Sequence, residues 1–373
     1  MSVTYKNGPI FDGDVLRHGC MLRMQDGVVQ DILLEDGAEG EVVDLNGDIL
    51  APGYVDLQVN GGGGLQFNAS PTVDTLETIS QAHRGLGATT ILPTLITDTP
   101  EVTHQAIEAA IAACKDGMSG IGGLHLEGPH LSPSRKGAHE ARFIRAMTQD
   151  DLSLYLKVAD QLPALMITVA PESVQLDQIR QLAEAGVVVS LGHSDTDFEC
   201  AMLCQQAGAR SVTHLFNAMS QLGNREPGLV GAALANDGLS AGIIADGIHV
   251  HPETIRSAWA AKRGHTGIFL VSDSMAVAGS DLRSFTLNDR VINREDGRLT
   301  LEDGTLAGAD LSLTRAIEVL VTEVGIELDA ALAAATNVPA RLMGMPKHVG
   351  RLHAGVSKDL IRIKSDLSAC SIL

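Results

Sequence analysis

The sequence predicts an α/β fold: a (β/α)8 barrel of the TIM type with a small β-sandwich domain formed by both termini. Two observations support this prediction. Across residues 52–345, eight apolar runs of strand length alternate with amphipathic helical patterns, which is typical of parallel βα units. In the flanking regions, 1–51 and 346–373, Gly, Asp and Asn turn signals instead separate short apolar runs, which favours a small β domain.

The expected elements follow one another in regular order. Strands are expected at 54–59, 88–93, 121–126, 165–170, 187–192, 211–215, 241–245 and 268–272. Helical patterns lie between them at 73–86, 102–114, 150–161, 176–185 and 198–207. Turn signals in 284–307 predict a hairpin inserted after the eighth strand, and helical patterns resume at 311–324 and 328–335.

Composition limits the class of protein. The chain has 373 residues, of which 45% are hydrophobic and 3% aromatic, so we expect a large and mostly aliphatic core. The net charge of −19 argues against nucleic acid or an anionic membrane as a partner, but it does not exclude a small phosphorylated substrate. Five cysteines without disulfide spacing, and the lack of a secretory signal or membrane-length apolar run, predict a cytoplasmic protein.

Four polar residues each close one of the apolar runs: Glu127, His193, His214 and Asp273. In a barrel the loops after the strands share one face, so these distant side chains are expected to meet there. A single histidine of this kind is more often a buried structural residue. Two imidazoles and a carboxylate at strand ends, however, favour one divalent metal ion, zinc or ferrous iron, held by Glu127, His193 and His214.

Two residues are candidates for catalysis beside this metal. Asp273 has a structural alternative as a helix cap, but at a metal site it would act as general base and then as general acid. His139 lies on the long loop after Glu127. Near the site it would donate a hydrogen bond to a carbonyl oxygen as negative charge develops there.

Three loop features remain. Arg225, in a turn-rich loop, would be merely solvated in most proteins, but in so acidic a chain it is a candidate phosphate clamp. His249 follows the seventh strand. The four glycines at 61–64 predict a tight turn, and their spacing does not match a dinucleotide-binding fingerprint.

Short motifs along nearly the whole chain point to one family. They lie at 52–61, 125–129, 136–139, 192–194, 213–219, 225–228, 245–249, 272–273 and 305–308. Together and in this order they resemble the N-acetylglucosamine-6-phosphate deacetylases of the amidohydrolase superfamily. The resemblance implies the same metal ligands and Asp273 as the acid–base residue. It also implies a homodimer in which Arg225 reaches the phosphate site of the neighbouring subunit.

The resemblance further implies a set of substrate contacts. His139 would touch the acetyl carbonyl and His249 the sugar or its phosphate. The loop after the sixth strand would meet the phosphate and sugar through Asn217 and Ala218, and Leu306 would line the pocket near the acetyl group.

One position departs from the wider superfamily. Many members carry His-x-His at the end of the first strand and bind a second metal there, whereas this chain has Gln58 and Asn60. An amide is a poor ligand beside an imidazole. We therefore expect one tightly held metal per subunit, with Gln58 and Asn60 as the position for a weak second ion.

These observations predict deacetylation of N-acetyl-D-glucosamine 6-phosphate to D-glucosamine 6-phosphate and acetate. Three alternatives stay open: the same reaction on N-acetylgalactosamine 6-phosphate, another cyclic-amide or N-acyl-amino-acid hydrolase, and a non-catalytic sugar-phosphate sensor. A sensor does not need an acid–base carboxylate beside a metal, which argues against the last of these.

Overall fold

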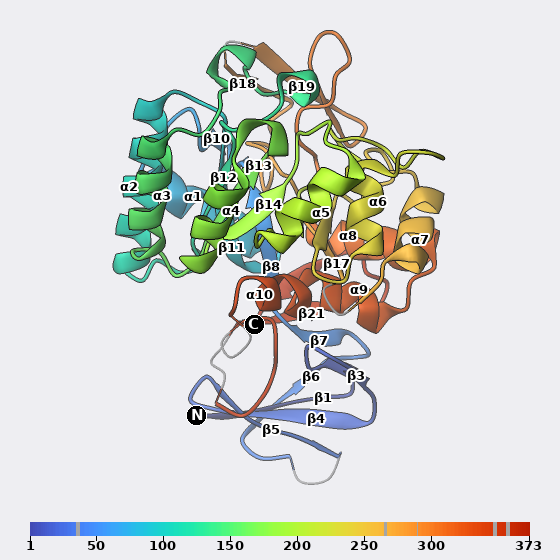
Figure 1. The fold of residues 1–373 in the computed structure, drawn as a ribbon. Coiled ribbons are helices and arrows are strands. Elements are labelled where there is room, and N and C mark those ends of the chain that lie inside the picture. The colour runs from blue at the N-terminus through green and yellow to red at the C-terminus, as the bar shows by residue number, and fades with distance from the viewer. Residues whose placement is uncertain (35–37, 265–266, 289, 346–348, 356–358) are drawn as a thin grey trace.

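The computed structural model describes residues 1–34, 38–264, 267–288, 290–345, 349–355 and 359–373. Its centre is an eight-stranded parallel sheet in which each strand pairs with its neighbours along the chain (Figure 1). The strands are β8 (Tyr54–Val59), β11 (Ala88–Ile96), β12 (Leu124–Glu127), β13 (Leu165–Val169), β14 (Val188–Leu191), β15 (Ser211–Val212), β16 (Ser240–Ile243) and β17 (Ile268–Leu270). Each overlaps one of the predicted apolar runs, and the predicted barrel is confirmed.

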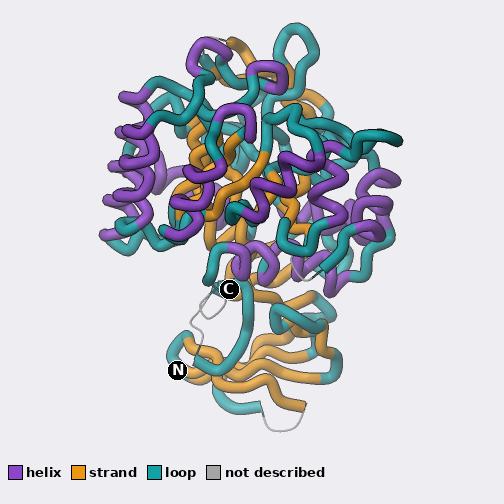
Figure 2. The backbone as a smooth tube through the Cα atoms, viewed as in Figure 1, coloured by secondary structure: helices purple, strands orange, loops and turns teal. Residues whose placement is uncertain are grey.

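Helices cover the outside of this sheet, as the helical patterns predict (Figures 1 and 2). They are α1 (Val73–Gly85), α2 (Pro100–Lys115), α3 (Gln149–Ala159), α4 (Leu176–Glu184), α5 (Phe198–Gln206), α6 (Gly228–Ala235), α7 (Pro252–Ala261), α8 (Leu313–Val319), α9 (Leu328–Ala335) and α10 (Asn337–Leu342). A π-helical turn, Leu320–Val324, extends α8, and single 3-10 turns lie at Pro133–Arg135, Ala141–Phe143 and Pro171–Ser173. Within the described residues, no helix combines the length and apolarity needed to cross a bilayer.

Side-chain caps explain where several of these helices begin. The side chains of Thr72, Thr99 and Asp197 each accept a hydrogen bond from a backbone N–H of the first turn of α1, α2 and α5. Such caps satisfy donors that have no partner inside the helix. The helices then bury mostly Ala, Leu, Ile and Val against the strands, which gives the aliphatic core that the composition predicts.

Two small sheets from the chain ends stack at one end of the barrel (Figure 1). One contains β5 (Val28–Leu34), β4 (Cys20–Gln25), β1 (Ser2–Lys6) and β6 (Glu41–Asp44). The other contains β22 (Cys370–Ile372), β21 (Leu360–Ile363), β7 (Ile49–Pro52), β2 (Ile10–Phe11) and β3 (Leu16–Arg17). Buried residues of both sheets, among them Leu22, Leu50 and Leu360, form one separate core. The predicted domain boundary at residue 346 lies outside the described residues.

The segment after β17 forms a three-stranded antiparallel insert rather than a simple hairpin. Its strands are β18 (Ser284–Leu287), β19 (Arg290–Glu295) and β20 (Arg298–Thr300). Buried Leu287, Ile292 and Leu299 of the insert share a cluster with Ile96 and Met275 of the barrel. The insert therefore lies over the barrel end opposite to the two terminal sheets (Figure 1).

The glycine run after β8 forms a second small hairpin. β9 (Gly61–Gly62) pairs with β10 (Leu65–Gln66), and Gly63 and Gly64 make the turn with positive φ values of 62° and 89°. A Cβ atom at Gly61 would lie 2.4 Å from the carbonyl oxygen of Leu65. The glycines are thus explained by the tight turn and by close backbone approach.

Candidate active site

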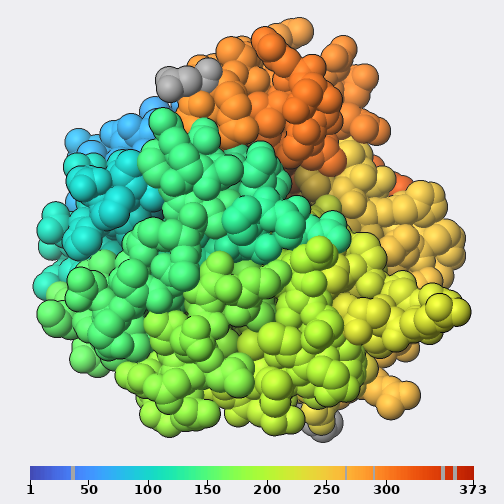
Figure 3. Space-filling view, turned by 45° about the horizontal axis from the view of Figure 1, so that its top comes forward, coloured from blue at the N-terminus to red at the C-terminus, as the bar shows by residue number. Residues whose placement is uncertain are grey.

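A cavity of about 400 Å³ opens at the barrel end that the insert covers. Figure 3 shows this face, where the insert (orange) borders the loop that follows β12 (green). Most of the residues singled out in the sequence meet in this cavity: Asn60, Glu127, His139, His193, His214, Asn217, Ala218, His249, Asp273 and Leu306. Gln58 lies behind them, where its amide donates to Glu127 Oε1 (3.1 Å).

The backbone at the strand ends turns sharply to aim these side chains inward. Glu127 is the last residue of β12, whereas His193, His214 and Asp273 follow β14, β15 and β17 by two or three residues. All three have positive φ values, 48°, 28° and 47° respectively. Such a conformation is costly for residues other than glycine and concentrates at functional sites.

The carboxylate of Glu127 and the imidazoles of His193 and His214 converge closely. Oε1 of Glu127 lies 3.2 Å from Nε2 of His193 and 3.1 Å from Nε2 of His214, and the two nitrogens are 3.1 Å apart. Ligand atoms about 2.1 Å from a tetrahedral zinc ion are about 3.3 Å from one another. The spacing of these three atoms therefore suits a shared metal ion.

The hydrogen-bond partners of His193 favour a cation in this cluster. Its Nδ1 donates to the carbonyl oxygen of Arg135 (2.8 Å), so its Nε2 carries a lone pair and faces the carboxylate of Glu127. Burial opposes ionisation of that carboxyl, whereas hydrogen bonds and positive charge from protonated imidazoles would hold the pKa of Glu127 well below its ordinary value. With both imidazoles neutral and their Nε2 atoms unprotonated, the three atoms are acceptors that face one another, and a divalent metal ion would satisfy all three.

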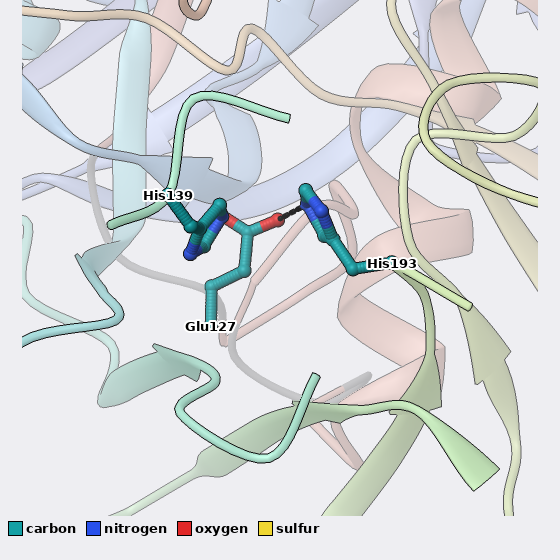
Figure 4. Close-up of side chains that lie close together, drawn as sticks. All are labelled: Glu127, His139 and His193. Carbon is teal, nitrogen blue, oxygen red and sulfur yellow. Dashed lines mark hydrogen bonds and ion pairs between the residues drawn. The ribbon is translucent and has the colours of Figure 1, made fainter. Parts of the chain in front are cut away.

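His139 lies on the other side of the same carboxylate, with its Nε2 3.9 Å from Glu127 Oε2 (Figure 4). Glu127, His139 and His193 each offer a ligand atom within 4.8 Å of the others, so distance alone would also allow His139 as a metal ligand. Nδ1 of His139 contacts Thr97 twice: the backbone N–H of Thr97 donates to it at 3.3 Å, and the Thr97 hydroxyl lies 2.9 Å away and can pair with it in either direction, so both tautomers of His139 find a partner there. Burial lowers the pKa of His139 to about 3, so the ring is neutral. Its Nε2 stays 3.9 Å from the carboxylate, whereas Nε2 of His214 lies 3.1 Å from both Glu127 Oε1 and His193 Nε2. His214 therefore fits the ligand role better than His139.

Asp273 is buried beside this cluster. Burial and the negative charge of Glu127 raise the pKa of Asp273 to about 6, while His214 and a hydrogen bond from Asn60 act in the opposite direction. Nδ2 of Asn60 donates to Oδ1 of Asp273 (2.7 Å). A carboxyl group with a pKa in this range can both accept and return a proton near neutral pH.

His249 is held by a neighbouring residue that the sequence analysis did not single out. Asp246 accepts hydrogen bonds from Nδ1 of His249 (2.6 Å) and from the backbone N–H groups of Ile248 and His249. Burial would raise the pKa of Asp246, but these bonds lower it, so the carboxyl is ionised. Nε2 of His249 is thereby left for the cavity. The spacing Asp-x-x-His was the signal available in the sequence.

Arg225 is a predicted site residue that this single chain leaves far from the cluster. It lies in an exposed loop before α6, and it is absent from the residues that line the pocket. Residues that the sequence analysis missed include Thr97, which orients His139, and Ala138 and Met275, which line the cavity. None of their side chains is of a type that indicates a catalytic or metal site from the sequence.

Comparison with known proteins agrees with this geometry. Residues 49–371 match the model of the amidohydrolase family. The chain is 40% identical to the N-acetylgalactosamine-6-phosphate deacetylase of Shewanella sp. (strain ANA-3), covering 95% of this chain and 90% of the relative. It is 33% identical to the N-acetylglucosamine-6-phosphate deacetylase of Haemophilus influenzae, over 92% and 90% of the two chains.

Solved structures support the same relationship. The crystal structure of N-acetylglucosamine-6-phosphate deacetylase from Pasteurella multocida superimposes with a TM-score of 0.94 and 32% identity, covering 100% of this chain and 98% of the other. With the fold, the buried carboxylate and imidazole cluster and these matches in agreement, the chain belongs to the amidohydrolase family.

Proposed function

We propose that this protein removes the acetyl group of N-acetyl-D-glucosamine 6-phosphate, giving D-glucosamine 6-phosphate and acetate. The observation that carries the proposal is the convergence of Glu127, His193 and His214 within hydrogen-bond distance of one another, beside the buried Asp273. Relatives that match over nine tenths of this chain are named as deacetylases of N-acetylated sugar 6-phosphates.

We assign Glu127, His193 and His214 as ligands of one divalent metal ion per subunit, zinc or ferrous iron. When bound, such an ion polarises a carbonyl group and lowers the pKa of water. The residues fit this ion because Oε1 of Glu127 and the Nε2 atoms of His193 and His214 lie within 3.2 Å of one another and each has a lone pair to offer when unprotonated. Gln58 and Asn60 instead donate to Glu127 and Asp273, which makes a second ion at this position unnecessary.

The remaining chemistry falls to two side chains. Asp273 takes a proton from the attacking water, whose oxygen bonds to the acetyl carbon. Nε2–H of His139 donates to the carbonyl oxygen as negative charge develops there. The low pKa of His139 keeps the ring neutral, and a neutral imidazole can carry its hydrogen on Nε2. The C–N bond then breaks, and Asp273 returns the proton to the departing amine, so that the carboxylate is regenerated.

Substrate binding completes the proposal. We place the sugar and its phosphate against His249, Asn217 and Ala218, and the acetyl group near Leu306, all of which line the cavity. Contacts distant from the reacting bond orient the substrate. We further propose a homodimer in which Arg225 reaches the phosphate of the neighbouring site. The cytoplasmic location stays a prediction from cysteine usage.

N-acetylgalactosamine 6-phosphate is the second candidate substrate, because the Shewanella relative with that activity in its name is 40% identical to this chain. The two sugars differ in the orientation of one hydroxyl group, so a single contact can decide between them.

The test is acetate release from both sugar phosphates by the purified protein, measured side by side, with the Asp273→Asn variant as control. We expect the glucosamine substrate to give the higher kcat/KM and the variant to lose activity by orders of magnitude. Binding of the sugar phosphate without acetate release would instead identify a sensor. A higher kcat/KM for the galactosamine substrate would assign the epimer and leave the chemistry unchanged.

A further inference from the structure

The first and last strands of the barrel meet without a regular backbone ladder. Within the described residues, β8 and β17 end the strand order, and the backbone pairing beside them is a single bridge between Val59 and Ser274. A side chain bridges the rest of this seam. The carboxylate of Asp56 accepts a hydrogen bond from the backbone N–H of Ser272, with its oxygens at 3.2 and 3.3 Å.

This seam surrounds Asp273, whose backbone is in the left-handed region. The N–H of the preceding residue, Ser272, donates to Asp56. The carbonyl oxygen of the following residue, Ser274, accepts from the backbone N–H of Asn60 (2.9 Å). The segment that carries the carboxylate is thus fastened to β8 on both sides, which holds a conformation that is costly for a non-glycine residue.

The side chain of Asn60 adds a third contact, directly to the carboxylate. Its Nδ2 lies 2.7 Å from Oδ1 of Asp273, and both residues are buried. A bond on Oδ1 fixes the plane of the carboxylate and leaves Oδ2 for the cavity. Among the described residues, Oδ1 of Asn60 has no hydrogen-bond partner, and the residue lines the cavity.

We propose that Asp56 and Asn60 are positioning residues for the acid–base carboxylate: Asp56 fixes the backbone that carries Asp273, and Asn60 fixes the side chain itself. The inference rests on the proposed deacetylase function. Asn60 would then serve proton transfer by orienting Asp273. From the sequence alone, it is considered instead as the position of a weak second ion.

A double-mutant cycle on kcat tests the part played by Asn60. Asn60→Ala should lower kcat about 10- to 100-fold, the range expected for one lost hydrogen bond to a charged group, and should change KM less than about 3-fold. In an Asp273→Ala background the same substitution should change the residual kcat less than about 3-fold, because no carboxylate remains to be positioned. An equal loss in both backgrounds, or no loss in either, would overturn the proposal.

Gln58→Ala provides the matched control. Gln58 lies two residues earlier, in β8, but its amide donates to Glu127 instead of Asp273. Gln58→Ala should therefore change kcat by the same factor in the wild type and in the Asp273→Ala background. If Asn60→Ala does not fold, Asn60→Leu replaces it, because this change removes the amide donor at similar volume and adds no charge.

Asp56 is tested by conservative rescue. Its Oδ1 accepts from the backbone N–H groups of both Gln58 and Ser272, each at 3.2 Å. Asp56→Asn keeps one such oxygen and should retain kcat within about 3-fold, whereas Asp56→Ala should lose about 10-fold or more. Equal kcat in the two variants would show that Asp56 is not a positioning residue for Asp273.

Failure of the proposed function would be seen separately, as a wild-type protein that releases no acetate from either sugar phosphate. In that case the double-mutant cycle of Asn60→Ala and Asp273→Ala is measured by the midpoints of urea unfolding. Asn60→Ala should then lower the midpoint more in the wild type than in Asp273→Ala, and equal shifts would overturn the positioning role.

Discussion

Nε2 of His214 lies 3.1 Å from Oε1 of Glu127, whereas Nε2 of His139 lies 3.9 Å from the other oxygen of the same carboxylate. His214 also lies 3.1 Å from Nε2 of His193, while Nδ1 of His139 is engaged by the backbone N–H and the hydroxyl of Thr97. His214, on the other side, has no comparable partner on Nδ1 within the described residues. We therefore propose different roles for the two histidines, with His214 as a metal ligand and His139 as a hydrogen-bond donor to the substrate.

The first prediction separates these two histidines. His139→Asn should retain the metal and lose about 10²- to 10³-fold in kcat, the cost typical of one missing oxyanion donor. His214→Asn should lose the metal as well. Metal content of the purified variants by elemental analysis, measured together with kcat, checks both. A His139 variant free of metal would show that the ring is a ligand.

Chelation gives the second prediction. Removing the metal leaves Glu127 against imidazole lone pairs in a buried site, so the apoprotein should unfold at a lower temperature as well as lose activity. Thermal unfolding before and after chelation, and after addition of zinc or ferrous iron, measures the effect. An unchanged Tm and an unchanged rate would mean that the cluster binds no ion.

Much of the barrel could be predicted because buried parallel strands read as continuous apolar runs. The prediction is less accurate at strand ends: the run 211–215 contains a strand of two residues, since the chain turns through positive φ at His214. The site residues at strand ends could be found because the fold collects them at one face. The contacts of Thr97 and Asn60 could not, because they depend on distances between segments far apart in the sequence.

The third prediction concerns the residue that holds His249. Asp246→Ala removes the acceptor for Nδ1 of His249 and for two backbone N–H groups, so the imidazole should lose its orientation. We expect KM for the sugar phosphate to rise about 10-fold, with a smaller change in kcat. Asp246→Asn keeps one acceptor oxygen and should restore part of the loss. A fall in kcat at constant KM would place His249 in the chemical step.

The fourth prediction tests the phosphate contact across subunits. Arg225 is exposed in this chain, so its effect depends on the proposed dimer. Arg225→Ala should raise KM for N-acetylglucosamine 6-phosphate far more than for N-acetylglucosamine, because the lost contact is to phosphate. Arg210, on another part of the barrel, serves as a control for the loss of one positive charge. Equal changes for both sugars would exclude phosphate recognition by Arg225.

The last prediction concerns stability and pH at the junction of the two chain ends. Burial would raise the pKa of Asp48, but hydrogen bonds from Arg362, Lys364 and the backbone N–H of Ser365 outweigh it and lower that pKa below its ordinary value. These residues join the segment before β7 to the C-terminal strand β21 and the residues after it.

A lowered pKa in the folded state means that the ionised form stabilises the fold. This contribution is fully present above the pKa of the unfolded chain, near 4, and is lost as the pH falls through the lower folded value. Asp48→Asn should therefore cost about 2 kcal/mol at pH 7 and progressively less below about pH 4. Urea unfolding at both pH values measures it. Asp359→Asn, in a half-exposed pair with Arg84, should cost little at either pH, and a loss at Asp48 that did not depend on pH would show that packing rather than charge holds the junction.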